Sequence, residues 1–284
     1  MRPGPDERHI DPSQAPCGAG GADLRALALA ALLAAQPAHK VALTRSIGAQ
    51  QAQLRVAATA PPVHGALPGR PERPALVHPA RVPKRSPSSP RGLAALLHAI
   101  AHIEFNAINL ALDAAWRFDG MPREFHTDWL RVASEEAHHF TLLCELLAAL
   151  GCAYGDFDAH DNLWLMCEKT RDDIVARMAL VPRTLEARGL DATPQIQHRL
   201  RGVGTPHALR AVEVLEIILR DEVGHVAIGN HWYRWLCERE RLDPLAHYPT
   251  LVERYQAPRL HPPFNQAARK RAGFSDTELA WLTA

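Results

Sequence analysis

Two segments of the chain pair a glutamate with a histidine three residues later. The segment EEAHHF contains Glu136 and His139, and the segment RDEVGHVAIG contains Glu222 and His225. On an α-helix, residues three apart lie on the same face, so each pair can direct a carboxylate and an imidazole at one metal ion. Two such pairs, with one further glutamate from each of two other helices, form the usual ligand set of a dinuclear metal site in a four-helix bundle.

A glutamate also precedes each pair at a similar interval. Glu104 lies 32 residues before Glu136, and Glu186 lies 36 residues before Glu222. This spacing predicts two repeated helix pairs, each of which supplies a glutamate and then a Glu-x-x-His. Two divalent cations would balance four carboxylates better than two imidazoles could in a buried ion-pair network. The predicted metal ligands are Glu104, Glu136, His139, Glu186, Glu222 and His225.

Helical phase distinguishes Glu136 and His139 from the overlapping pair Glu135 and His138. Residues advance by about 100° along a helix, and the apolar stripe of this segment includes the first pair and excludes the second. Glu104 lies in the middle of the apolar stripe of its own segment, where a carboxylate needs a partner. The stripe that selects Glu136 and His139 is formed by Trp129, Val132, Leu143, Leu147 and Leu150.

Glu186 has the weakest position in this set. It lies about a third of a turn or more away from the apolar stripe of its segment. Pro182 should kink this helix and can reset its phase. Asp173 and Glu168 are the alternative ligands in the same segment.

Apolar periodicity predicts an all-α protein built on a four-helix bundle. Nine prolines between residues 61 and 90 rule out a continuous helix there and predict an extended connector that lies along the helical core. Glycine and proline breakers separate the long helical segments, including a gap from Gly189 to Pro194. The expected helices cover residues 90–118, 122–150, 158–189 and 204–240. The expected division is a disordered or irregular N-terminus (1–21), short helices with the proline-rich connector (22–89), the bundle (90–240) and a C-terminal extension (241–284).

The chain resembles a family of uncharacterised bacterial ferritin-like proteins, domain of unknown function 455, from about residue 22 to 255. The resemblance implies a ferritin-like di-iron carboxylate fold. It also implies a distant similarity to a di-iron tRNA hydroxylase of the same superfamily. The resemblance implies the same six metal ligands and adds support for Glu186. Because His138 lies next to His139, it leaves open which of the two imidazoles binds the metal. The matching motifs are AHIE (101–104), LALD (110–113), DWLRVASEEAHHF (128–140), VPRTLEARGLD (181–191) and RDEVGHVAIGN (220–230).

Carboxylates with one imidazole for each metal favour two iron ions, with manganese as the alternative. The expected function is a di-iron oxidoreductase that activates dioxygen and hydroxylates or oxidises an unknown organic substrate, either a small molecule or a modified nucleoside. An electron donor is a further expected partner. Tyr233, two turns after His225, is a candidate neighbour of the metals, although an ordinary core tyrosine is the simpler interpretation. The alternatives are an iron-handling ferroxidase or storage protein and a metal-stabilised structural module without turnover.

The composition narrows the cellular setting. Lys and Arg number 32 and Asp and Glu 31, so the formal net charge is +1 and no overall field attracts nucleic acid or an anionic membrane. The N-terminus lacks the basic start and the apolar run of a secretory signal, which predicts a cytoplasmic protein. A monomer or a small homo-oligomer is a separate expectation. His98 and His102 share a helix face that excludes Glu104, so we expect surface or interface histidines there.

Overall fold

The structure is a computed structural model that describes residues 21–83 and 85–283. Within these ranges every regular element is helical, which confirms the expected all-α fold. The N-terminal residues 1–20, expected to be irregular, lie outside the described part of the chain.

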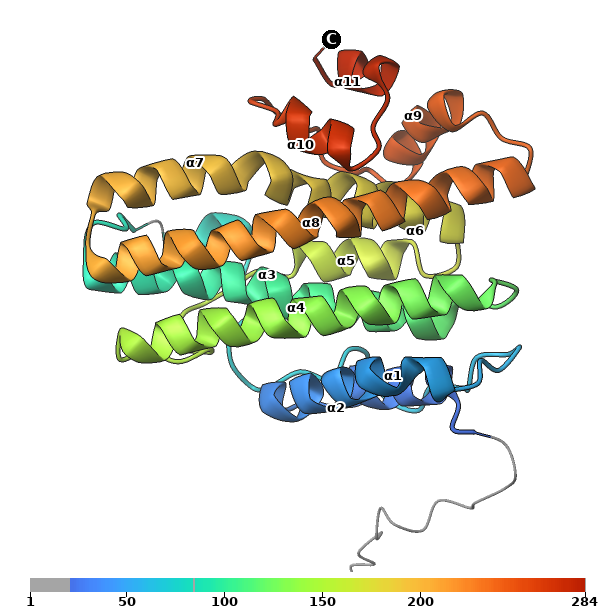
Figure 1. Cartoon of the computed structure of the whole chain (residues 1–284), viewed down its shortest axis with the longest axis horizontal. Helices are drawn as coiled ribbons and strands as arrows, with labels where there is room; N and C mark the ends of the chain where they lie inside the picture. The colour runs from blue at the N-terminus through green and yellow to red at the C-terminus, as the bar shows by residue number, and fades with distance from the viewer. Residues whose placement is uncertain (1–20, 84, 284) are drawn as a thin grey trace, which may run out of the picture.

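Four long helical segments lie side by side and form the centre of the molecule (Figure 1). Three of them are continuous helices, namely α3 (Pro90–Arg117), α4 (Arg123–Ala149) and α8 (Pro206–Arg239). The fourth consists of α6 (Ile174–Leu180), the π-helix η3 (Val181–Glu186) and α7 (Ala187–Val203) joined end to end. Contacts run from α3 to α4, from α4 to α8 and from α8 to α7. The predicted bounds of the three continuous helices are correct to within two residues.

The prediction of one helix over residues 158–189 is wrong. The short helix α5 (Asn162–Lys169) is separate, and α6 begins only after Asp173, whose side chain accepts a hydrogen bond from the Ala176 amide at 2.9 Å. The helix then continues through Gly189 and Pro194, where a gap was expected. A glycine and a proline cost about 1 and 3 kcal/mol in a helix interior, but burial of an apolar face against the bundle can outweigh that cost. Leu190 and Leu200 of this helix are fully buried, Leu200 in the main core and Leu190 in a second apolar cluster with residues of α8 and the C-terminal helices.

Two short helices, α1 (Leu24–Leu33) and α2 (Pro37–Gln50), pack against α3 and α4. The one-turn helix η1 (Gln51–Gln53) ends α2, and the proline-rich connector that follows contains a second one-turn helix, η2 (Pro79–Arg81). The connector is attached to the helices by hydrogen bonds from Trp116 Nε1 to the Pro61 carbonyl (2.9 Å) and from the Val77 amide to the Ala159 carbonyl (2.8 Å).

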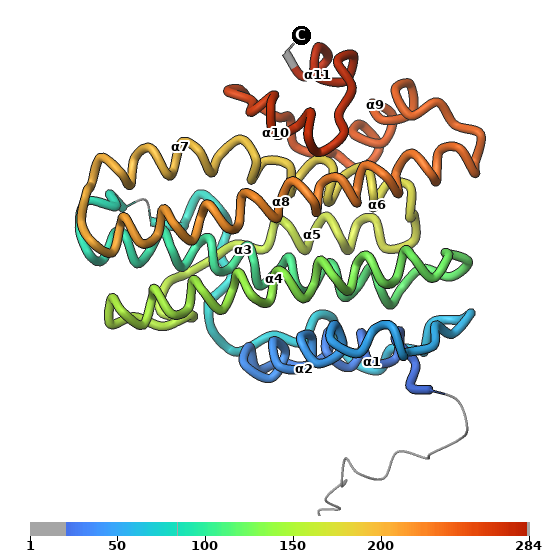
Figure 2. Tube along the Cα trace, in the orientation of Figure 1, coloured from blue at the N-terminus to red at the C-terminus, as the bar shows by residue number. Residues whose placement is uncertain are grey.

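Three short helices follow α8 and cover the opposite side of the bundle from α1 and α2 (Figure 2). These helices are α9 (Pro244–Arg254), α10 (Gln266–Arg271) and α11 (Asp276–Thr283). Ser275 and Glu278 begin α11 with reciprocal hydrogen bonds of the capping-box type: the Ser275 amide donates to Glu278 Oε2 (2.7 Å) and the Glu278 amide to Ser275 Oγ (3.3 Å).

Judged by its length and composition alone, the helix α3 could cross a membrane. Most of this stretch is buried inside the bundle, however, as it is in the central helix of many folded proteins. Its apolarity is therefore explained by its contacts with α1, α4 and α5.

Candidate metal centre

The six predicted ligands come from the four segments of the bundle and are all buried. Glu104 lies on α3 and Glu186 is the last residue of the π-helix. Glu136 and His139 lie on α4, and Glu222 and His225 lie on α8. Within each pair the two residues are about one helical turn apart. The exposed fraction does not exceed 8% for any of the six residues.

Glu136 lies between the two imidazoles. Its Oε2 is 3.2 Å from Nδ1 of His139, and its Oε1 is 2.9 Å from Nδ1 of His225. Oε2 of Glu104 is 3.3 Å from the same nitrogen of His139, and Oε1 of Glu222 is 3.9 Å from that of His225. The structure thus forms two groups able to hold a metal ion, Glu104/Glu136/His139 and Glu136/Glu222/His225, with Glu136 common to both.

Glu186 belongs to neither of these two groups, but it lies beside the second. Burial and then the charges of Glu222 and Glu136 raise its pKa well above the usual range. It faces the bundle because the chain forms a π-helix from Val181 to Glu186, with Pro182 in its first turn. A π-helical turn holds more residues than an α-helical turn, so it shifts the phase of everything after it. This shift explains why simple α-helical periodicity placed Glu186 off the apolar stripe.

Two acidic residues outside the predicted ligand set contact the Nε2 atoms of the two histidines, whose Nδ1 atoms face the glutamates. Nε2 of His139 is 3.1 Å from Oδ2 of Asp221 on α8, and Nε2 of His225 is 2.6 Å from Oε2 of Glu135 on α4. Each histidine is therefore oriented by the helix that carries the other pair. When Nε2 carries the proton and donates a hydrogen bond to the carboxylate, Nδ1 keeps a lone pair that can bind a metal. The sequence signal was the acidic residue directly before each glutamate of the two pairs.

The charges in the cluster are strongly coupled. Burial and the neighbouring Glu136 raise the pKa of both Glu104 and Glu222. Burial alone would lower the pKa of His139, but its hydrogen bonds to Asp221 and Glu136 and the Glu104 carboxylate 3.3 Å away raise that pKa to about 12. For Glu136, burial would raise the pKa, but the charge of His225 and the hydrogen bond from His139 hold it well below its usual range. Without a metal the cluster must therefore retain protons that a metal would displace.

Several ligand atoms have no hydrogen-bond partner within the described residues. These buried atoms are both carboxylate oxygens of Glu186, Glu104 Oε2, Glu136 Oε1, Glu222 Oε2 and His225 Nδ1. His225 Nδ1 and Glu136 Oε1 are only 2.9 Å apart, yet their alignment does not make a hydrogen bond. An unsatisfied buried polar atom costs roughly 1–3 kcal/mol, and so many in one place fit a site made to hold cations.

The structure distinguishes the two neighbouring histidines of α4 that were candidates for a metal ligand. His138 is exposed, whereas His139 is fully buried among the carboxylates. Glu135 is part of the site, but as the partner of His225. Tyr233 is buried, and its hydroxyl donates a hydrogen bond to the Pro244 carbonyl at 2.8 Å.

The expectation of surface histidines at His98 and His102 is wrong. Both are buried, because Tyr154 and the loop around Gly155 cover this face of α3. Nε2 of His98 accepts a hydrogen bond from the Gly155 amide (2.9 Å), and Nδ1 of His102 lies 2.8 Å from the Tyr154 hydroxyl. Burial lowers the pKa of His98 to about 4 and that of His102 to about 3, so both rings are neutral near pH 7.

The fold and the site together define an all-α helical bundle with a buried, carboxylate-rich group of potential metal ligands at its centre. The chain belongs to the family described as "Protein of unknown function (DUF455)", whose profile matches residues 33–280. An uncharacterized protein of Haemophilus influenzae is 52% identical over 219 residues, which cover 75% of each of the two chains. No solved structure matches the chain.

Proposed function

We propose that this protein is a ferritin-like, di-iron oxidoreductase that activates dioxygen and hydroxylates or otherwise oxidises an organic substrate. The observation that supports this proposal is the position of Glu136, whose two oxygens face the histidines of two adjacent ligand groups. A carboxylate shared in this way suits two cations held close together. Oxygen and imidazole ligands without thiolate favour iron, with manganese as the alternative.

Each part of the cluster would have a definite task. Glu104, Glu136 and His139 would hold one ion, and Glu136, Glu222, His225 and the adjacent Glu186 would hold the other. Asp221 and Glu135 would fix the imidazole rings and increase their basicity. Two ferrous ions held there would supply the reduction of dioxygen, a redox reaction that no side chain of the cluster can carry out.

Burial of the cluster would restrict access of water and would keep reactive oxygen species away from the solvent. Hydroxylation of a C–H bond puts one oxygen atom of dioxygen into the product and reduces the other to water. This balance consumes two electrons and two protons beyond the substrate. The proposal therefore includes an external electron donor as a partner, and Asp221 or Glu135, each hydrogen-bonded to a histidine, could conduct protons between the cluster and the surface.

The test begins with the metal-free protein loaded anaerobically with two equivalents of Fe(II). We expect mixing with dioxygen to give a transient visible absorption band and consumption of dioxygen. The His138→Ala variant should behave like the parent, because His138 is exposed, and the His139→Ala variant should lose both signals. A parent protein that binds iron tightly but shows neither signal would overturn the proposal in favour of a structural metal site.

The size of the iron-loaded protein separates the oxidoreductase from an iron store. We expect a monomer or a small oligomer in sedimentation experiments, with about two metal ions for each chain by elemental analysis. A hollow shell with a mineral core would contradict the proposed function and would assign the protein to iron storage.

A further inference from the structure

A hollow lies between the C-terminal helices and the π-helix, apart from the metal ligands. Its volume is about 100 Å³, and about 550 Å³ when the open space at its mouth is included. Leu245 and Trp281 stand at the mouth, where 45% and 52% of their surfaces are exposed. Exposed apolar side chains beside a hollow are typical of a site for a ligand or a partner.

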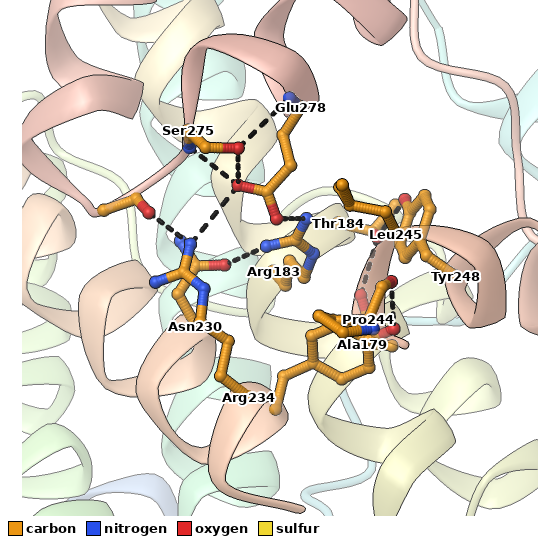
Figure 3. A network of polar contacts seen from close by, with 12 residues as sticks. Ala179, Arg183, Thr184, Asn230, Arg234, Pro244, Leu245, Tyr248, Ser275 and Glu278 are labelled. Atoms are coloured by element: carbon orange, nitrogen blue, oxygen red, sulfur yellow. Dashed lines mark hydrogen bonds and ion pairs between the residues drawn. The ribbon is translucent and has the colours of Figure 1, made fainter. Parts of the chain in front are cut away.

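Arg183 of the π-helix forms one side of this hollow and is 4% exposed. Figure 3 shows its guanidinium between Asn230 and Glu278, to which Nη1 and Nη2 donate hydrogen bonds of 2.5 Å each. Its carbon Cζ lies 4.7 Å from the centre of the Phe274 ring and 5.3 Å from that of Tyr248. The third nitrogen, Nε, is buried and has no hydrogen-bond partner among the described residues.

Arg269 of α10 forms a second cationic side and is completely buried. Its Nη2 donates to Oδ2 of Asp191 at 2.6 Å, and its Cζ lies 5.2 Å from the centre of the same Phe274 ring. Its Nη1 is also buried and also lacks a partner within the described part of the chain. Two arginines that contact one aromatic ring therefore each keep a spare donor.

Each arginine that lines the hollow is paired with one carboxylate. Arg183 and Arg234 both contact Glu278, and Arg269 pairs with Asp191. Burial alone would raise the pKa of Glu278, but the charge of Arg183 and hydrogen bonds from Ser275 lower it, so this carboxylate stays ionised at neutral pH. Arg183 and Arg269 therefore have their own counter-charges, and each has one N–H donor left over for a ligand.

We propose that this hollow binds a small aromatic anion, either an aryl carboxylate or an aryl phosphate. The anionic group would accept hydrogen bonds from the spare donors of Arg183 and Arg269. The ring would pack against Tyr248 and Trp281, whose own rings meet edge to face with centroids 5.5 Å apart. The site is independent of the proposed metal chemistry, so its occupation can be measured on the metal-free protein.

The test compares three probes of similar size, benzoate, phenyl phosphate and the uncharged benzamide, by ligand-observed NMR titration of the full chain. We expect saturable binding of at least one of the two anions, and binding of benzamide weaker by about tenfold or more, because charge-assisted hydrogen bonds are the stronger ones. The better of the two anions identifies the headgroup. Absence of saturable binding for both anions, or equal affinity for benzamide, would overturn the proposal.

Variants at the mouth locate the binding without disturbing the buried arginines. Leu245→Asp and Leu245→Asn have nearly the same shape, and both suit the second position of α9, so both should fold. The Asp variant should bind the preferred anion several-fold more weakly than the Asn variant. Equal affinities in the two variants would show that the probe binds elsewhere and would overturn the assignment. Trp281→Ala should weaken the binding of all three probes. An unchanged affinity would also contradict the assignment of the binding site to this hollow.

Discussion

Gly229 of α8 lies directly against Pro182 of the π-helix. A Cβ atom added to Gly229 would lie only 2.5 Å from Cβ and 2.7 Å from Cγ of Pro182, closer than such atoms approach in folded proteins. The proline ring is rigid and cannot turn aside. His225 lies one turn before Gly229, and Glu186 lies four residues after Pro182, so this contact sets the separation of the two helices that carry them.

The substitution Gly229→Ala should therefore push the π-helix away from α8. We expect a loss of about 1–3 kcal/mol in the free energy of unfolding, as for other overpacked cores. We also expect the metal content to fall from about two ions for each chain to about one, because Glu186 moves while Glu104, Glu136 and His139 stay in place. Urea unfolding and elemental analysis would measure the two effects.

Gly224 provides the matched control on the same helix. Apart from the adjacent residues and the backbone of its own helix, no atom of the described residues lies within 4 Å of a Cβ built at this position. Gly224→Ala should leave the metal content unchanged and should stabilise the helix by roughly 0.5–1 kcal/mol, since alanine restricts the unfolded chain more than glycine does. If both variants behave alike, the contact between Gly229 and Pro182 does not position the site.

A second prediction concerns the adjacent histidines of α4. His139→Ala removes a buried imidazole between Glu104 and Glu136, and we expect at least one of the two metal ions to be lost. His138→Ala alters only an exposed side chain and should keep both ions. Elemental analysis after dialysis against a weak chelator would distinguish them. Retention of two ions by His139→Ala would show that the cluster does not use this imidazole.

A third prediction is that metal affinity rises with pH. The pKa of His139 is raised to about 12, and the pKa values of Glu104, Glu186 and Glu222 are also raised, so the metal-free cluster holds protons near neutral pH. A metal must displace these protons, and each proton released makes binding about tenfold tighter for each unit of pH. Calorimetric titration with Mn(II) between pH 6 and 8, in two buffers of different ionisation enthalpy, counts the protons. An affinity independent of pH would contradict this charge distribution.

Much of the site could be predicted because α-helical periodicity is a local property. Phase alone selected Glu136 and His139, and the structure buries both of them. The π-helix could not be predicted in this way, because its wider turn departs from the α-helical period on which the phase argument rests. Glu186 was therefore identified by spacing and by resemblance, and it looked misplaced on an ideal helix.

The features that were missed depend on contacts between distant parts of the chain. The pairing of Asp221 with His139 joins residues 82 positions apart, and the burial of His98 depends on a loop 57 positions away. The continuation of α7 through Pro194 likewise depends on the surface that the helix covers. None of these contacts leaves a periodic signal in the residues that make them.

The last prediction concerns Glu186 in the metal-free protein. Its side chain is 7% exposed and neither oxygen has a partner within the described residues, so it is a source of instability whenever no cation is present. Glu186→Leu should raise the free energy of unfolding of the metal-free protein by roughly 1–3 kcal/mol and should reduce the further stabilisation that a metal provides. Glu213→Leu is the control, since Glu213 is exposed and its replacement should change stability by no more than about 0.5 kcal/mol.

The pH dependence of the same variant gives an independent measurement. Because burial raises the pKa of Glu186 well above 4.5, the folded protein holds a proton that the unfolded chain releases. This group therefore contributes stability that is complete below pH 4.5 and is lost as the pH rises through the folded pKa, by up to about 1.4 kcal/mol for each unit. Urea unfolding in the presence of a chelator should show a shallower decline for Glu186→Leu than for the parent between pH 5 and 8. A variant that is less stable than the parent, with the same slope, would mean that Glu186 is satisfied in the metal-free protein and is not held ready for a cation.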